Sequence, residues 1–142
     1  MAPNVSLPEA PLVLLIDDDE GDRKHWADAL RNPPFQYSVF EAETGASGLH
    51  IYRHQPVDCV VLDLDMPQSG FLTLVRLVPD RKRPQIPVII LTHLIHPTLF
   101  ELVKKYGACA CLVKHHSSTE DLASTIQQAM ASVKSMQDGH AA

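Results

Sequence analysis

The fold of this chain is decided by the stretch LVLLIDDDE, residues 12–20, in which an apolar run ends in acids. A second run of the same kind, CVVLDLDMP, occupies residues 59–67. Short apolar runs are typical of buried parallel strands, whose carboxyl ends carry the chemistry of open α/β sheets. If the two strands are neighbours, Asp17, Asp18 and Asp63 share one crevice. Such carboxylates repel one another unless a proton or a cation relieves them, and ligands that are all oxygen favour Mg²⁺.

The composition is that of an ordinary globular domain. The 142 residues are 45% hydrophobic and 20% charged, which suits one domain with a substantial core. The formal net charge of −5 argues against non-specific binding to nucleic acid. No apolar stretch approaches the roughly 18 residues of a membrane span, and residues 1–8 lack the features of a secretory signal.

The chain has three cysteines, Cys59, Cys109 and Cys111, all in apolar runs. An odd number of buried thiols is typical of reduced cysteines, so we expect a cytoplasmic location. The pair Cys109 and Cys111 has two interpretations, half of a metal site or two buried residues on one face of a strand. The apolar context favours the second.

Strand-like and helix-like segments alternate along the chain. The expected strands are residues 12–16, 36–41, 58–62, 87–91 and 109–113, and the expected helices are residues 20–31, 45–54, 70–78, 97–106 and 119–133. This alternation predicts an α/β fold, a doubly wound, five-stranded parallel sheet with helices on both faces. The flavodoxin-like order 2-1-3-4-5 would place the strands before Asp17 and Asp63 side by side. We expect one domain at residues 11–134, with disordered ends at 1–10 and 135–142.

Two further strand ends carry side chains that suit a phosphoryl group. Thr92 follows VIIL, residues 88–91, and Lys114 follows CLV, residues 111–113. In the same strand order both reach the edge that carries the acids. Mg²⁺ and the Lys114 ammonium would neutralise phosphoryl oxygens, and the Thr92 hydroxyl would donate a hydrogen bond. An aspartate at this edge can act as the nucleophile and form an acyl phosphate.

At these residues the chain resembles the receiver domain of two-component response regulators. The matching motifs are LLIDDD at 14–19 with Arg23 downstream, VVLDLDMP at 60–67, VIILT at 88–92 and GACACLVK at 107–114. Each motif alone is weak, but four of them in the right order at four strand ends are specific. The resemblance covers most of the chain, from the first expected strand into the last expected helix.

The resemblance implies roles for individual residues. Asp63 would be the phospho-acceptor. Asp18 and Asp63 would bind Mg²⁺ through their carboxylates, Asp17 through a water molecule, and Asp65 through its backbone carbonyl. Thr92 and Lys114 would hold the oxygens of the phosphoryl group.

The resemblance also implies how the protein works. It would be a phosphorylation-switched signalling module rather than an enzyme, taking its phosphoryl group from a sensor histidine kinase or a histidine phosphotransfer protein. We expect it to act through a separate output protein, with no direct contact to nucleic acid or a membrane. The face made by the fourth and fifth helices would suit a homodimer.

Four departures from the family pattern concern the same edge. The loop at residues 66–70 is one residue short. The residue after the conserved threonine is usually small but is His93 here, which is either an exposed loop residue or a shield over the acyl phosphate. Cys111 stands where the family often has an aromatic switch residue. His115 replaces the proline that forms a cis peptide bond after the lysine, so we predict a trans Lys114–His115 bond.

Two other functions stay open beside a phosphorylated receiver. The shortened loop and the departures at His93, Cys111 and His115 favour a pseudo-receiver, an interaction module that keeps the fold without phosphorylation. The spacing of Asp63 and Asp65 also matches the nucleophile motif of haloacid-dehalogenase-like phosphatases. That family, however, places its motif on the first strand and needs a longer chain.

Overall fold

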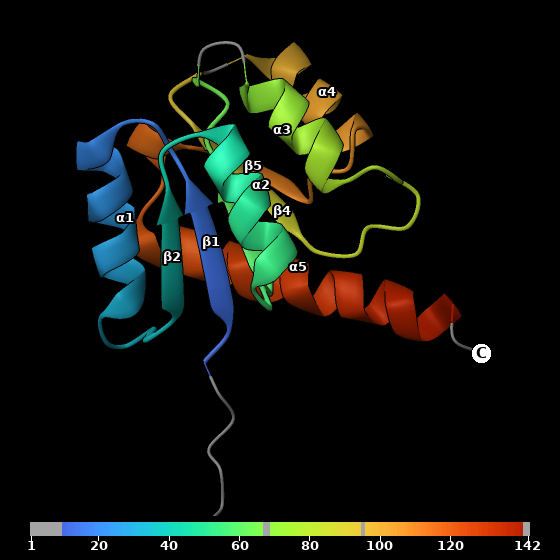
Figure 1. Cartoon of the computed structure of the whole chain (residues 1–142), viewed down its shortest axis with the longest axis horizontal. Coiled ribbons are helices and arrows are strands. Elements are labelled where there is room, and N and C mark those ends of the chain that lie inside the picture. Colours follow the sequence, from blue (N-terminus) through green and yellow to red (C-terminus); the bar gives the residue numbers. More distant parts are fainter. Residues whose placement is uncertain (1–9, 67–68, 95, 141–142) are drawn as a thin grey trace, which may run out of the picture.

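The computed structural model describes residues 10–66, 69–94 and 96–140 of the chain. Its strands are β1 (Leu12–Ile16), β2 (Ser38–Ala42), β3 (Cys59–Leu62), β4 (Val88–Thr92) and β5 (Ala110–Val113). Its helices are α1 (Glu20–Arg31), α2 (Gly45–His54), α3 (Gly70–Leu77), α4 (Pro97–Lys105) and α5 (Thr119–His140), with a 3₁₀ turn η1 (Lys114–His116). All neighbouring strands are parallel in the order β2-β1-β3-β4-β5, which confirms the predicted sheet (Figure 1).

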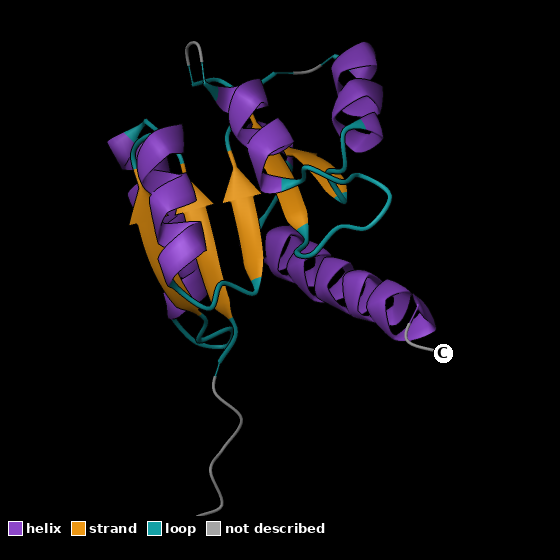
Figure 2. Ribbon diagram, turned by 45° about the vertical axis from the view of Figure 1, so that its right-hand side comes forward, coloured by secondary structure: helices purple, strands orange, loops and turns teal. Residues whose placement is uncertain are grey.

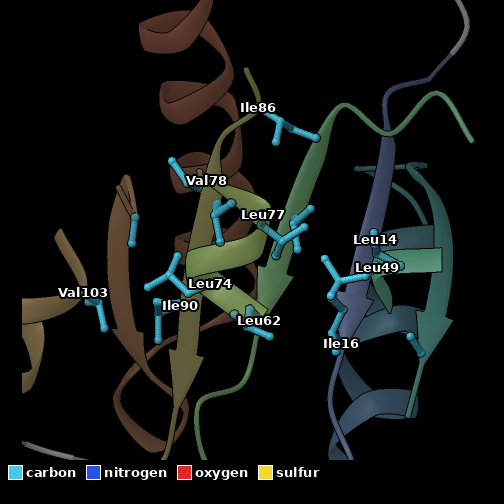
Figure 3. Packing of buried hydrophobic residues seen from close by; sticks show 14 of the residues in the cluster. Leu14, Ile16, Leu49, Leu62, Leu74, Leu77, Val78, Ile86, Ile90 and Val103 are labelled. Carbon is cyan, nitrogen blue, oxygen red and sulfur yellow. The ribbon is translucent and has the colours of Figure 1, made fainter. Parts of the chain in front are cut away.

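The core forms two layers, one on each face of the sheet, because successive strand side chains point to opposite faces. Leu14, Ile16 and Leu62 belong to the layer under α2, α3 and α4 (Figure 3). Val13 and Leu15 belong to the other layer, under α1 and α5. The sheet is therefore covered by helices on both faces (Figure 2). β3 is its central strand, and β1 lies beside it.

Two element boundaries differ from the sequence predictions by more than one residue. β2 begins at Ser38 rather than at residue 36, because the positive φ of Gln36, 55°, is incompatible with a strand there. α5 continues to His140 instead of ending near residue 133, so most of the segment predicted to be a disordered tail is helical. The Gln137 side chain in this extension donates a hydrogen bond to the backbone oxygen of Gln85, 3.0 Å away. The predicted N-terminal lead lies almost entirely outside the described residues.

Within the described ranges, none of the helices combines the length and the apolar character needed to cross a membrane.

Candidate functional site

Three carboxylates gather at the carboxyl edge of the sheet. β1 and β3 are neighbours with Ile16 opposite Leu62, and the residues that follow them are Asp17 and Asp63. The Asp63 backbone N–H donates to the oxygen of Ile16 at 2.9 Å, which continues the strand pairing into the site. One oxygen each of Asp17, Asp18 and Asp63 lies within 4.8 Å of the others. The sequence prediction that these acids share one crevice is therefore confirmed.

Backbone contacts fix the two buried carboxylates. The Asp19 N–H donates to Oδ1 of Asp17 at 2.9 Å, and the Asp65 N–H donates to Oδ1 of Asp63 at 2.8 Å. Nη1 of buried Arg23 donates to the backbone oxygen of Asp17, also at 2.9 Å. Because each anchor involves backbone atoms next to a buried strand, the acids are held in place by the sheet itself.

The amine of Lys114 occupies the centre of the site. Its Nζ donates to Oδ2 of Asp17 at 2.7 Å, to Oδ2 of Asp63 at 2.9 Å and to Oδ2 of Asp22 at 3.0 Å. The Lys114 side chain is only 3% exposed. Burial lowers the pKa of Lys114, but the hydrogen bonds to the carboxylates of Asp17, Asp63 and Asp22 outweigh it and leave that pKa above the ordinary value. Lys114 is thus a fixed cation among three acids.

Asp63 is almost completely buried, and this shapes its acidity. Desolvation raises the pKa of Asp63 to about 6, and the nearby Asp17 charge adds to the rise. The backbone N–H of Asp65 and the ammonium of Lys114 oppose it by stabilising the carboxylate. Both oxygens of Asp63 accept a hydrogen bond, one from each of these groups.

The side chain of Asp65 turns toward β4 rather than toward the other acids. Its Oδ1 accepts from the Thr92 hydroxyl at 3.1 Å, and its Oδ2 accepts from the His93 backbone N–H at 3.0 Å. The Thr92 hydroxyl oxygen also accepts from the Leu94 N–H at 3.2 Å. The structure therefore brings Thr92 to the predicted edge, with its hydroxyl bound to Asp65.

The two histidines that depart from the family pattern contact each other. Nδ1 of His93 lies 2.8 Å from Nε2 of His115, and Nε2 of His93 lies 2.8 Å from Oδ2 of Asp22. His93 is thus engaged in side-chain contacts, although 37% of its side chain is exposed. In the described part of the chain the cis peptide bond is Pro33–Pro34, so the predicted trans Lys114–His115 bond is confirmed. The shortened loop falls partly outside the described residues, at 67–68.

The cysteines of the last strand lie away from this cluster. Cys111 packs on the α2–α4 side of the sheet, where burial raises its pKa to about 11. Cys109 packs on the α1–α5 side, where burial also raises its pKa. The expectation that they share one face is wrong, because Cys109 precedes β5 and the alternation of the strand has not begun there. Among the described residues, no potential metal-binding group includes a cysteine.

Two residues of the site were not assigned a role from the sequence. Asp22 lies in the first turn of α1 and reaches back to Lys114. Arg23 holds the backbone of Asp17, and its Nε lies 3.3 Å from Oε1 of Glu41 in β2. The position of Asp22, one helical turn after the acid cluster, could have indicated that its carboxylate belongs to the site. The burial of Arg23 could not be read from a helix that is polar on most positions.

The donor set of the acid cluster fits a hard divalent cation. Asp17, Asp18 and Asp63 offer carboxylate oxygens only, and Asp18 is exposed to solvent. Lys114 supplies a positive charge beside them. A site of this kind can bind a metal ion and neutralise the charge of a phosphoryl group.

Comparisons with known proteins agree on one family. A family model described as "Response regulator receiver domain" matches residues 13–127. The probable chemotaxis protein CheY of Rhizobium etli is 33% identical over 113 residues, covering 78% of this chain and 85% of that protein. The transcriptional regulatory protein GlrR of Escherichia coli K12 is 40% identical over 80 residues, which are 56% of this chain but only 17% of that protein.

Solved structures show the same fold. A response regulator receiver domain protein from Clostridium thermocellum superposes with a TM-score of 0.77 at 27% identity, covering 89% of this chain and 98% of that one. A CheY-like receiver domain protein from Methanospirillum hungatei gives a TM-score of 0.78 at 20% identity, covering 90% and 99%. The five-stranded sheet and its covering helices are therefore common to these proteins.

Proposed function

Because this chain belongs to the response-regulator receiver domain family, we propose that it is a signalling domain switched by phosphorylation of Asp63. The observation that carries the proposal is the triad of Asp17, Asp18 and Asp63 with the Lys114 amine on Asp63. A buried acceptor carboxylate, a cation-binding cluster and a fixed ammonium are the groups that phosphoryl transfer to an aspartate requires.

The transfer is a displacement at phosphorus. An oxygen of Asp63 attacks the phosphoryl group of a phosphohistidine on a histidine kinase or a histidine phosphotransfer protein. The new P–O bond forms as the P–N bond breaks, and the electron pair returns to the leaving imidazole nitrogen. In the unphosphorylated structure Lys114 donates to Oδ2 of Asp63. After the transfer it would donate to a phosphoryl oxygen. The Thr92 hydroxyl would leave Asp65 to bind another phosphoryl oxygen.

We propose Mg²⁺ as the cation of this site. The carboxylates of Asp17, Asp18 and Asp63 and the backbone carbonyl of Asp65 would hold it, which suits a cation that prefers oxygen ligands. Bound there, it would supply positive charge for the phosphoryl oxygens.

The added phosphoryl group would act on partners through a change of local charge. It brings about −1.5 to −2 charges at neutral pH, which biases a two-state element nearby. We propose that the output is a separate protein and that α4 and α5 form the face for a partner or a second copy. Leu102 on α4 and Met136 on α5 are exposed apolar side chains that such contacts would cover. The expected cytoplasmic location stays a prediction.

One observation favours the alternative function, a pseudo-receiver that binds partners without phosphorylation. Asp63 is 3% exposed, and both of its oxygens already accept hydrogen bonds. Among the described residues, no buried side-chain nitrogen or oxygen lacks a hydrogen-bond partner. The site is thus satisfied as it stands, and phosphorylation requires Lys114 to move.

Intact-mass analysis after incubation with acetyl phosphate distinguishes the two functions. With Mg²⁺ the wild type should gain about 80 Da, the mass of one phosphoryl group, and without Mg²⁺ it should gain nothing. Asp63→Asn should lose the adduct, because an amide is not a nucleophile for this transfer. Asp65→Asn is the matched control at the same strand end, and it should retain the adduct at a reduced rate.

Each outcome selects one function. An adduct that depends on Mg²⁺ and on Asp63 establishes a working receiver. A wild type that binds no Mg²⁺ and gains no mass is a pseudo-receiver. An adduct that persists in Asp63→Asn but disappears in Asp65→Asn would show that Asp65, and not Asp63, is the acceptor.

A further inference from the structure

Four side chains form a continuous chain of polar contacts over the acceptor. Nε2 of His115 lies 2.8 Å from Nδ1 of His93, and Nε2 of His93 lies 2.8 Å from Oδ2 of Asp22. The same oxygen of Asp22 accepts from Nζ of Lys114 at 3.0 Å. Through the amine of Lys114 the chain ends on Asp63. Residues from α1, from the loop after β4 and from the turn after β5 are thereby linked.

One pair of neutral tautomers satisfies every contact in this chain. If the N–H of His93 is on Nε2, it donates to Asp22, and Nδ1 is left as an acceptor. His115 then donates from its own Nε2–H to Nδ1 of His93. The donors run in one direction, from His115 to His93 to Asp22, and Asp22 accepts from both His93 and Lys114.

The chain joins an exposed layer to a buried one. The Lys114 and Asp63 side chains are each 3% exposed, whereas Asp22 is 30% and His93 is 37% exposed. The ring pair is also close, with centroids of His93 and His115 at 4.5 Å. The outer three residues therefore lie on the solvent side of the amine and hold it from outside.

We propose that Asp22, His93 and His115 are positioning residues that retain Lys114 on the carboxylates of the unphosphorylated site. We refer to these three residues as the brace. The inference rests on the proposed function, in which Lys114 leaves Asp63 for a phosphoryl oxygen. The contact between Lys114 and Asp22 belongs to the starting state and is given up during the transfer. Interactions stronger in the ground state than in the transition state slow a reaction, so the brace limits the phosphorylation rate.

The rate of phosphorylation by acetyl phosphate with Mg²⁺ tests the brace. Asp22→Asn should react about tenfold faster, since it removes a charged hydrogen-bond acceptor of Lys114. His93→Ala and His115→Ala should each react about threefold faster, since they leave Asp22 less firmly held. The double variant of both histidines should be no faster than His93→Ala alone, because the residues act in one chain. His93→Gln, which keeps a side-chain donor, should recover part of the wild-type rate.

Two control variants separate the brace from other causes. Glu20→Gln removes a negative charge from the same first turn of α1, so it measures the effect of charge alone. His116→Ala removes a neighbouring ring that makes no side-chain hydrogen bond in the described part of the chain. Both should keep the wild-type rate. Brace variants that are no faster than these controls, or histidine effects that multiply, would overturn the proposal.

Histidine NMR keeps the brace testable without phosphorylation. Long-range ¹H–¹⁵N correlation spectra should show the Nε2–H tautomer for both His93 and His115, and Asp22→Asn should change the His93 signals and spare those of His116. If no variant takes a phosphoryl group, the proposed function fails. Averaged tautomers for His93 and His115 in the wild type would then show that the contacts of the brace are absent as well.

Discussion

The two sides of the site are built in different ways. On the acid side, Asp17 and Asp63 follow β1 and β3, whose residues are buried except for the partly buried Leu12. Backbone N–H groups bind the carboxylates of Asp17 and Asp63. On the cover side, His93 and Lys114 follow β4 and β5, and their contacts are to side chains from distant parts of the sequence. All four residues of β5 are only partly buried. The acid side therefore inherits its geometry from the sheet, whereas the cover side depends on side-chain partners.

The largest effect should come from the residue at which the two sides meet. Lys114→Met removes the cation from three carboxylates, two of them buried. Removing one partner of a buried ion pair costs about 3–5 kcal/mol, so the free energy of unfolding should fall by that order. Urea unfolding of the Mg²⁺-free protein measures it.

The matched control for this change is Lys104→Met, at the exposed end of α4. Its free energy of unfolding should stay within about 0.5 kcal/mol of wild type, as for most surface substitutions. If Lys114→Met were equally harmless, the carboxylates would not depend on Lys114 for their charge balance, and the two sides would be independent.

The second prediction compares the strands themselves. Leu62→Ala, in β3 directly before Asp63, should cost about 3 kcal/mol, because the side chain is completely buried and leaves a cavity. Leu112→Ala, in the partly buried β5, should cost about 1 kcal/mol, because neighbours and solvent can fill the space. Urea unfolding of both variants checks the order. Equal losses would mean that β5 is as firmly packed as the centre of the sheet.

The acid side was predictable because it follows from local pattern and topology. Apolar runs gave the strands, the alternation gave the parallel sheet, and the strand order put Asp17 beside Asp63. Local backbone conformation was harder to foresee. The positive φ of Gln36 shortens β2 at its start, and nothing in its neighbourhood, such as a glycine, indicated it.

The cover side was only partly predictable. The sequence placed Thr92 and Lys114 at the correct edge, but it could not show that the Thr92 hydroxyl binds Asp65. It also treated His93 and His115 as separate departures, although they are in contact. These contacts join residues that are far apart in the chain, and no periodicity within one element encodes them. Assigning such partners requires the folded arrangement.

Arg23 offers a third prediction, because it ties the acid side to β2. It is buried, and its Nη1 donates to the backbone oxygen of Asp17 while its Nε lies near Glu41. Arg23→Met should lower the free energy of unfolding by about 2 kcal/mol, since a buried backbone oxygen loses its charged donor. Thermal or urea unfolding measures the loss. Glu43→Gln is the control, because Glu43 is 75% exposed and such surface pairs contribute at most about 1 kcal/mol.

The smallest effect on stability is expected from Mg²⁺ binding. Substitutions on the two sides of the site should change the affinity for Mg²⁺ in opposite directions. A ligand that binds only the folded protein stabilises it by about 1.4 kcal/mol at ten times its Kd, so Mg²⁺ should raise the unfolding midpoint measurably. Asp18→Asn should weaken Mg²⁺ binding, because it removes a ligand oxygen of the cluster. Lys114→Met should strengthen it, because the amine no longer competes for the carboxylates. Isothermal titration calorimetry gives both Kd values.

Glu20→Gln serves as the charge control for the metal, since it removes a carboxylate that is two residues after Asp18, in the first turn of α1, and that lies outside the cluster. Its Kd should stay close to that of the wild type, because an exposed charge is screened by solvent and salt. If Lys114→Met bound Mg²⁺ more weakly than wild type, Lys114 would be arranging the carboxylates for the metal rather than competing with it. The cover side would then help the acid side to bind the metal even before phosphorylation. The two sides would differ in how their residues are held in place, but both would promote metal binding.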